Sequence, residues 1–306
     1  KKHYPQISLD AKPDYEAISQ KNYMLVHQLG ALVYHNTDVL LLSVVSGLKV
    51  VSVYSIYKLV MSQLGNLLFN IQNSVDFILG QTYQTDRAKY IRRIDQFESW
   101  FSALAFSVYG VIFFALYSFV RLYTSGVEDV VYADRLLVLM FVSIELLSAM
   151  RQPMQQTINY AGHFKNTLPQ TLIETGLKLV ISLIGVAIWG IYGVLAGTII
   201  SQLYRVNDVI FYANTKLLRR GVQRTYSIHA INFLVFIIAQ LLFSAIFPDI
   251  TTWKDFVTVG ILAGCISLPL FLAAQTLAWP DNRASLRYYL KNSRQLFQKV
   301  FKKQGK

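Results

Sequence analysis

Residues 172–205, LIETGLKLVISLIGVAIWGIYGVLAGTIISQLYR, contain two apolar runs separated by a short turn with two glycines, WGIYG at 189–193. With its neighbours, each run is long enough to cross a bilayer as a helix, which takes about 20 residues. The stretch therefore predicts a helical hairpin of two membrane spans, over 169–189 and 191–215.

The rest of the chain has the same character. It has 306 residues, of which 54% are hydrophobic and 15% charged, and its mean hydropathy is +0.37. Soluble domains are less apolar and carry about 25% charged residues. The sequence predicts an all-α fold, a polytopic transmembrane helix bundle with eight spans. The six further spans are expected near 23–46, 51–80, 99–123, 131–160, 229–247 and 255–278.

Positive charge is concentrated in alternate connections. The connections 124–134 and 189–193 contain no Lys or Arg, and 247–255 contains only Lys254. Because loops rich in Lys and Arg stay in the cytoplasm, the alternation predicts a multi-pass protein with both ends cytoplasmic. The basic side chains lie between the second and third spans and between the sixth and seventh: Arg87, Lys89, Arg92, Arg93, Lys216, Arg219, Arg220 and Arg224.

The formal net charge of +12 comes mainly from these connections and from the C-terminal segment, which is rich in Lys and Arg. That distribution favours contact with anionic membrane lipid over nucleic-acid binding. At the end of the chain, apolar residues recur at helical spacing between Lys and Arg, which indicates an amphipathic helix on the membrane surface; a solvated tail is the alternative. We expect a cytoplasmic lead-in at 1–22, a six-helix transmembrane lobe at 23–215, two peripheral transmembrane helices at 216–278 and a basic amphipathic cytoplasmic tail at 279–306.

Polar residues in four of the spans follow one another at steps of three or four, so each set shares one helix face. Lipid does not solvate such faces, and charged residues at membrane depth usually face a bundle interior or a water-filled cavity. The last two spans carry no such set and are expected at the periphery. The four sets are Ser55, Lys58, Ser62, Asn66, Asn70, Asn73 and Asp76; Glu145, Ser148, Gln152, Gln155 and Asn159; Gln170, Glu174, Lys178 and Ser182; and Thr198, Gln202, Arg205 and Asp208.

Three basic residues are expected in one layer of the bundle. Residues equally far from a tight turn lie level across a hairpin, because a helix rises about 1.5 Å per residue. By this count Arg151 lies level with Lys178, and Arg205 lies level with the turn of helix that carries Glu174 and Lys178. The group is either an ion-pair network that holds helices together or a cationic cavity for an anionic ligand.

The stretch LVYHNTDVLLLSVV at 32–45 places Asp38 inside an apolar run. An ionised, unpaired carboxylate at this depth is costly. Counting residues from the next turn puts Lys58 level with Asp38, which makes Lys58 its expected partner. The alternative is that Asp38 belongs to a site that gains and loses a cation.

Four stretches together resemble the Wzx-type polysaccharide repeat-unit flippases of the multidrug/oligosaccharidyl-lipid/polysaccharide exporter superfamily. They are NTDVLLLS (36–43), GLKVVSVYSIY (47–57), RQPMQQTINYAGHFKNT (151–167) and the opening stretch, 172–205. Such flippases have two six-helix lobes and two additional helices. The resemblance implies that this chain is the second lobe of a two-lobe flippase fold with the additional pair, and that the N-terminal lobe is missing.

The resemblance implies transport of an undecaprenyl-pyrophosphate-linked oligosaccharide across the bacterial cytoplasmic membrane by alternating access, for capsule, O-antigen or exopolysaccharide synthesis. The implied partners are the lipid-linked oligosaccharide, membrane lipid, the missing lobe and a monovalent cation, without a cofactor. Asp38 is the candidate for ion coupling. The candidates for the substrate cavity are Lys58, Asn66, Asn70, Arg151, Glu174, Lys178 and Arg205.

Two other functions remain open. One is a different exporter of the same superfamily, either a peptidoglycan-precursor flippase or a drug exporter, although four basic cavity candidates argue against a cationic drug. The other is a membrane acyltransferase that uses His35. The sequence displays neither a metal-ligand cluster nor a nucleophile–base arrangement, so we expect a transporter and not an enzyme.

Overall fold

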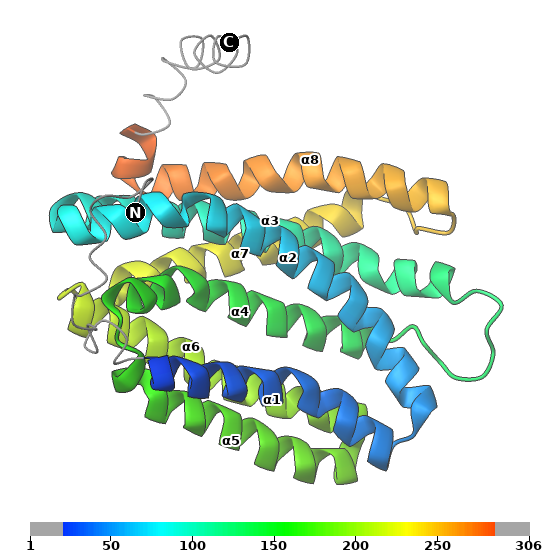
Figure 1. The fold of residues 1–306 in the computed structure, drawn as a ribbon. Helices are drawn as coiled ribbons and strands as arrows, with labels where there is room; N and C mark the ends of the chain where they lie inside the picture. Colours follow the sequence, from blue (N-terminus) through cyan, green and yellow to red (C-terminus); the bar gives the residue numbers. More distant parts are fainter. Residues whose placement is uncertain (1–20, 285–306) are drawn as a thin grey trace, which may run out of the picture.

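The computed structural model describes residues 21–284, and over this range the chain is helical without a β-strand (Figure 1). The predicted lead-in and amphipathic tail lie almost entirely outside the described residues. The helices are α1 (Lys21–Val45), α2 (Leu48–Thr85), α3 (Arg87–Tyr123), α4 (Arg135–Ala161), α5 (Phe164–Trp189), α6 (Ile191–Tyr212), the π-helical turn η1 (Ala213–Leu217), α7 (Gln223–Ile246) and α8 (Trp253–Ala278).

These helices coincide with the eight expected spans to within a few residues at most ends. The helices α3, α4, α5, α7 and α8 are long and apolar enough to cross a membrane. The other three, α1, α2 and α6, fall short of that criterion because polar side chains interrupt their apolar runs. The chain therefore belongs to the class of helical membrane proteins.

Side chains at the turns define where several helices begin. Asp86 accepts a hydrogen bond from the backbone N–H of Lys89 (2.9 Å) at the start of α3, and Asp134 accepts one from Leu136 (2.6 Å) at the start of α4. At the start of α8, Thr252 and Asp255 form a reciprocal capping box. These bonds satisfy donors that have no partner within the helix.

Successive helices run in opposite directions (Figure 1). The α2–α3, α4–α5 and α6–α7 connections lie at one end of the bundle, which we call the basic end because it carries the basic residues of 87–93 and 216–224. The other four connections lie at the opposite end. The basic residues of the α2–α3 and α6–α7 connections thus lie together in space, as their alternation along the sequence predicts.

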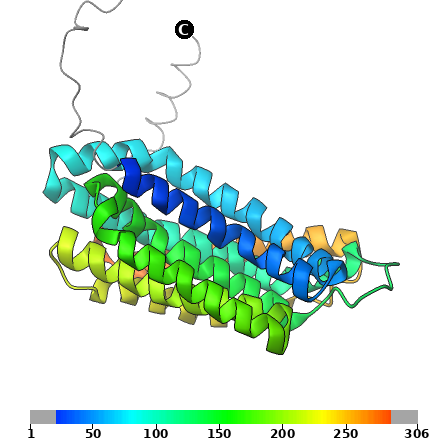
Figure 2. The same ribbon diagram turned by 60° about the horizontal axis from the view of Figure 1, so that its bottom comes forward.

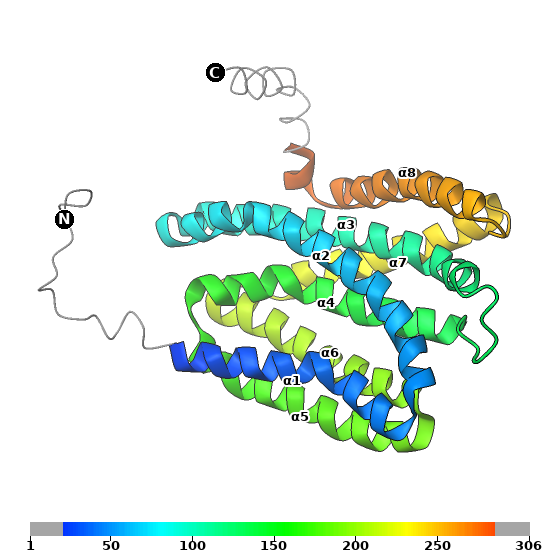
Figure 3. The same cartoon turned by 45° about the vertical axis from the view of Figure 1, so that its right-hand side comes forward.

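The helices form two groups that meet where α3 packs against α4. The α5–α6 hairpin packs against α1 and α4, and α7 and α8 pack against α3 and each other. From the turn at Gly47, α2 diverges from α1 and crosses toward α3 (Figures 1 and 3). Figure 2 shows α1 lying between α2 and α5. As a result, α1 is supported mainly by α5.

Glycines allow the backbones of α5 and α6 to approach closely. A Cβ atom at Gly185 would lie 2.7 Å from the carbonyl oxygen of Gly193, and one at Gly197 would overlap Ser182. Gly190, between the helices, has a φ of 57°, in the left-handed region that glycine adopts without strain. Small residues at helix contacts are the usual means of close packing in membranes.

The last two spans carry no continuous polar stripe, as the sequence predicts, yet polar side chains are buried on both of them. His229 and Asn232 on α7 and Gln275 on α8 are buried, and the side-chain amide of Gln275 donates to Asn232 Oδ1 (3.0 Å) and to the carbonyl oxygen of Ile228 (3.1 Å). The polar residues are divided between two helices, so neither helix alone displays a continuous stripe. In the sequence, the spacing of His229 and Asn232, three residues apart, was the signal that α7 has a buried polar contact.

A charged cluster joins α3 to the start of α7 at the basic end. Arg220 pairs with Asp95 and lies 3.9 Å from the buried carboxylate of Glu98, and Arg224 lies 3.5 Å from Asp95. These contacts join α3 to the segment that leads into α7. Part of the positive charge assigned to loops is therefore engaged in holding the helices together.

Candidate functional site

Asp38 is buried between α1, α2 and α5. Lys178 Nζ lies 3.0 Å from Asp38 Oδ1 and 3.2 Å from Oδ2, and the hydroxyl of Tyr54 donates to Oδ2 (3.0 Å). The same ammonium donates to the carbonyl oxygen of Tyr34 and lies 3.9 Å from the centre of the Tyr34 ring. Asp38 is thus held by a lysine and a tyrosine in a site closed to solvent.

The expectation that Asp38 pairs with Lys58 is wrong, because its ion-pair partner within residues 21–284 is Lys178. Counting from a turn gives the height of a residue along its helix but not the direction in which its side chain points. Because α2 diverges from α1, α5 supplies the partner. Lys58 instead lines a cavity of about 90 Å³ with Asp38, Glu145 and Lys178.

Glu174 on α5 joins α4 to α6. Arg151 Nη1 lies 2.8 Å from Glu174 Oε1, and Arg205 Nε lies 3.4 Å from Oε2. Arg205 also donates from Nη1 to Asp208 Oδ2, one turn further along α6 (2.7 Å). Of the three basic residues expected in one layer with Glu174, Arg151 and Arg205 contact Glu174 itself, while Lys178, one turn along α5, pairs with Asp38.

A cavity of about 210 Å³, here called the arginine cavity, lies beside this network between α1, α4, α5 and α6. Two guanidinium groups and one carboxylate, those of Arg151, Arg205 and Glu174, line it. A second carboxylate, Asp208, pairs with Arg205 but lines a different hollow on α6. The side chain of Arg151 is 24% exposed, whereas that of Arg205 is 4% exposed. The two guanidinium groups are balanced by Glu174 and by Asp208, which pairs with Arg205, and Arg151 is the accessible donor of the network.

Two residues of the arginine cavity were not among the sequence candidates. His27 Nδ1 shares a hydrogen bond with the hydroxyl of Thr171 (3.0 Å), and its Nε2 lies 2.9 Å from the carbonyl oxygen of Phe164. The hydroxyl of Tyr34 contacts the hydroxyl of Ser201 (3.1 Å). Their spacing, at 27, 34 and then Asp38, is that of one helix face, so the pattern was present in the sequence.

The structure separates Asn66 and Asn70 from the other candidates. Both are exposed on α2, and neither lines the arginine cavity or the smaller cavity beside Lys58. His35 lines both cavities and stacks edge-on against Tyr34 with ring centres 5.6 Å apart. The candidate site therefore consists of side chains from α1, α2, α4, α5 and α6.

No protein-family model matches this chain, and neither a curated protein nor a solved structure matches it. The fold and the site define the class from geometry alone: a helical membrane protein with an ion-paired polar layer inside one group of helices.

Proposed function

We propose that this chain is the second lobe of a flippase that moves an undecaprenyl-pyrophosphate-linked oligosaccharide across the bacterial cytoplasmic membrane. The observation that carries the proposal is the arginine cavity, where the guanidinium groups of Arg151 and Arg205 lie on either side of Glu174 and Arg151 is partly exposed. Guanidinium groups bind phosphate through two parallel hydrogen bonds, and such contacts strengthen where water is scarce. The role we assign to the cavity is transport, with no catalytic step.

The geometry supports a pyrophosphate ligand in a second way. Glu174 holds the guanidinium groups of Arg151 and Arg205 through different oxygen atoms, so both groups are oriented before a ligand arrives. A dianion that reached Arg151 would compete with Glu174 for it. If the ligand replaced Glu174 as the partner of Arg151, the ion pair that joins α4 to α5 would break. Ligand binding would then change how these two helices contact each other.

A second lobe would cover polar surface that lipid does not solvate. Gln63, Asn66, Asn70 and Asn73 are exposed along α2. In membrane transporters, polar surfaces of this kind line the space between two lobes that move against each other. We therefore expect residues 1–306 alone to bind the ligand but not to flip it.

The proposal includes eight spans, with α1, α2 and α6 crossing the membrane beside the five more apolar helices. It also places the basic end in the cytoplasm, because connections rich in Lys and Arg remain on that side. The orientation follows from the charge difference between the two ends of the bundle, since the 124–134 connection has no Lys or Arg.

Single cysteines can test this orientation. In a Cys265→Ser background, needed because Cys265 is exposed, Ser125→Cys should react with an impermeant thiol reagent in intact cells. Lys216→Cys should react only after the cells are opened. Lys216 is chosen because it is exposed and outside the Arg220–Asp95 cluster. Labelling of Lys216→Cys in intact cells would contradict the orientation.

Binding of a prenyl pyrophosphate to the purified protein tests the proposed function. The purified protein in lipid nanodiscs should bind a short prenyl pyrophosphate, measured by titration calorimetry. Arg151→Gln should weaken binding roughly tenfold, the value of one charge-assisted hydrogen bond. Arg151→Lys should restore part of the affinity, because an ammonium lacks the two-pronged geometry of a guanidinium.

Arg92→Gln is the matched control, since Arg92 is exposed at the basic end and lies outside the arginine cavity. Elution of each variant as a monodisperse species by size exclusion separates binding from folding. Equal affinity in the Arg151 and Arg92 variants, with both folded, would contradict the proposed site.

A further inference from the structure

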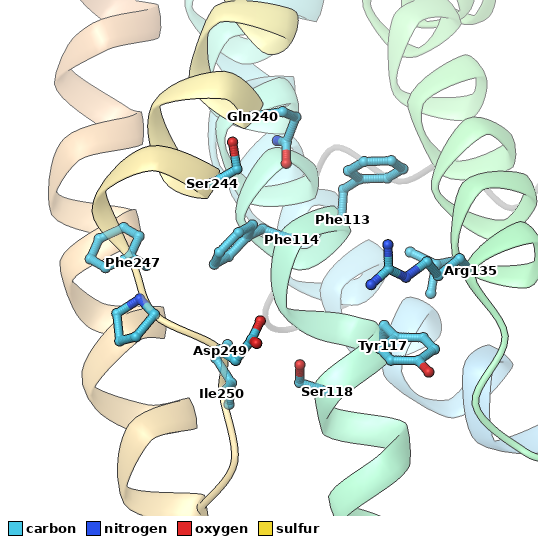
Figure 4. A pocket seen from close by; sticks show the side chains of 12 residues that line it. Phe113, Phe114, Tyr117, Ser118, Arg135, Gln240, Ser244, Phe247, Asp249 and Ile250 are labelled. Carbon is cyan, nitrogen blue, oxygen red and sulfur yellow. The ribbon is translucent and has the colours of Figure 1, made fainter.

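A larger cavity, of about 450 Å³, lies between α3, α4 and α7 at the end of the bundle opposite to the basic end (Figure 4). We call it the rim cavity. Phe113, Phe114 and Phe247 supply apolar walls, and Ser118, Gln240 and Ser244 add polar groups. Arg135 and Asp249 are its charged members. None of these residues belongs to the arginine cavity.

The walls of the rim cavity are held in place by their own contacts. Phe114 packs against Phe243 and Phe247, with ring centres 5.6 and 6.1 Å apart. The amide of Gln240 donates to the carbonyl oxygen of Gly110 (2.9 Å). Arg121 donates to the carbonyl oxygen of Ile250 (2.6 Å) and so anchors the segment that carries Asp249. The cavity is therefore built before a ligand binds.

Two opposite charges face this cavity from different elements. The guanidinium of Arg135 lies 5.2 Å from the centre of the Tyr117 ring, which orients it without neutralising it. Across the part of the chain that the structure describes, neither Arg135 nor Asp249 forms a salt bridge. Figure 4 shows Asp249 on one side of the cavity, near Phe114 and Ser118, and Arg135 on the other side, next to Tyr117.

We propose that the rim cavity binds the headgroup of a zwitterionic membrane phospholipid that carries a primary ammonium, as ethanolamine phospholipids do. The phosphate contacts Arg135, the ammonium contacts Asp249, and the acyl chains follow Phe113, Phe114 and Phe247 into the bilayer. The rim cavity shares no residue with the arginine cavity, so this proposal does not depend on what the chain transports.

The position of the cavity, its volume and its two opposite charges select this ligand. Its position at the ends of membrane-length helices matches the depth of lipid headgroups, and its volume lies within the range of small-molecule sites. A phospholipid with an anionic headgroup supplies a phosphate but no cation, and leaves Asp249 beside a like charge. A choline headgroup has a cation without N–H groups, so it makes no hydrogen bond to Asp249.

Native mass spectrometry of the delipidated protein tests the proposal. Ethanolamine, choline and glycerol phospholipids with identical chains are added in turn, and the bound fraction is measured. We expect the ethanolamine lipid to bind best. Asp249→Asn should reduce its binding about three- to tenfold, to the level of the choline lipid, as loss of a partly exposed charged hydrogen bond implies.

The other variants separate the two charges and control for folding. Arg135→Gln should weaken all three lipids, and Asp249→Glu should keep the ethanolamine preference. Glu128→Gln and Lys254→Gln are matched controls, exposed at the same end and outside the cavity, and should leave binding unchanged. Equal binding of the three lipids, a preference for the glycerol lipid, or an Asp249→Asn variant that binds like the wild type would each overturn the proposal.

Discussion

Asp38→Asn should lower the free energy of unfolding by about 3–5 kcal/mol, because it leaves the Lys178 ammonium buried without its carboxylate. The side chains of the pair are only 2% and 5% exposed, so water does not replace the lost partner. The measurement is thermal unfolding of the purified protein in detergent. The complete transporter that carries this substitution should also lose export.

A second substitution distinguishes a static pair from ion coupling. Asp38→Asn combined with Lys178→Met should recover much of the lost stability, since it removes both charges. Asp38→Asn combined with Lys58→Met is the control and should recover little, because Lys58 is not the ion-pair partner of Asp38. Equal recovery in the two double variants would contradict the Asp38–Lys178 pair.

Ion coupling by Asp38 stays a prediction, and the same variants test it in the complete transporter. If the Asp38–Lys178 pair only holds α1 to α5, the Asn/Met variant should export and still respond to an imposed ion gradient. If Asp38 takes up a monovalent cation, that variant should fold but lose the response. The Lys178 ammonium already lies against both carboxylate oxygens, which favours the static pair.

Gly185→Ala should destabilise the protein by about 1–3 kcal/mol or more, the usual cost of overpacking. The added Cβ would lie 2.7 Å from the carbonyl oxygen of Gly193 and 2.9 Å from its Cα atom. Backbone atoms on a neighbouring helix yield only if α5 and α6 separate. The expected result is a lower unfolding temperature in detergent and a smaller yield of folded protein.

Gly176→Ala is the control on the same helix. A Cβ at Gly176 would have no atom within 4 Å apart from its chain neighbours and the backbone of its own helix. Because glycine in a helix is less favourable than alanine by about 1 kcal/mol, this substitution should be neutral or stabilising. A Gly185→Ala variant as stable as Gly176→Ala would show that α5 and α6 are not in close contact at Gly193.

The sequence by itself determined the helices of this protein and which polar residues share a helix face. Apolar runs of membrane length, interrupted by glycine or charged turns, set the eight helices near their observed bounds. Counting residues from the turns placed Arg151, Lys178 and Arg205 in one layer with Glu174, and Arg151 and Arg205 do contact Glu174. Both features depend on residues close together in the chain, where periodicity is a direct consequence of helix geometry.

Only the tertiary structure decided which faces meet. Asp38 pairs with Lys178, which is 140 residues away, because α1 packs along α5 while α2 diverges. The hydrogen bond from Gln275 to Asn232, between α8 and α7, and the rim cavity, between α3, α4 and α7, likewise arise where separate helices come together. The height of a side chain follows from counting residues along its helix, but its partner depends on how neighbouring helices are rotated and inclined, which the packing of the whole bundle determines.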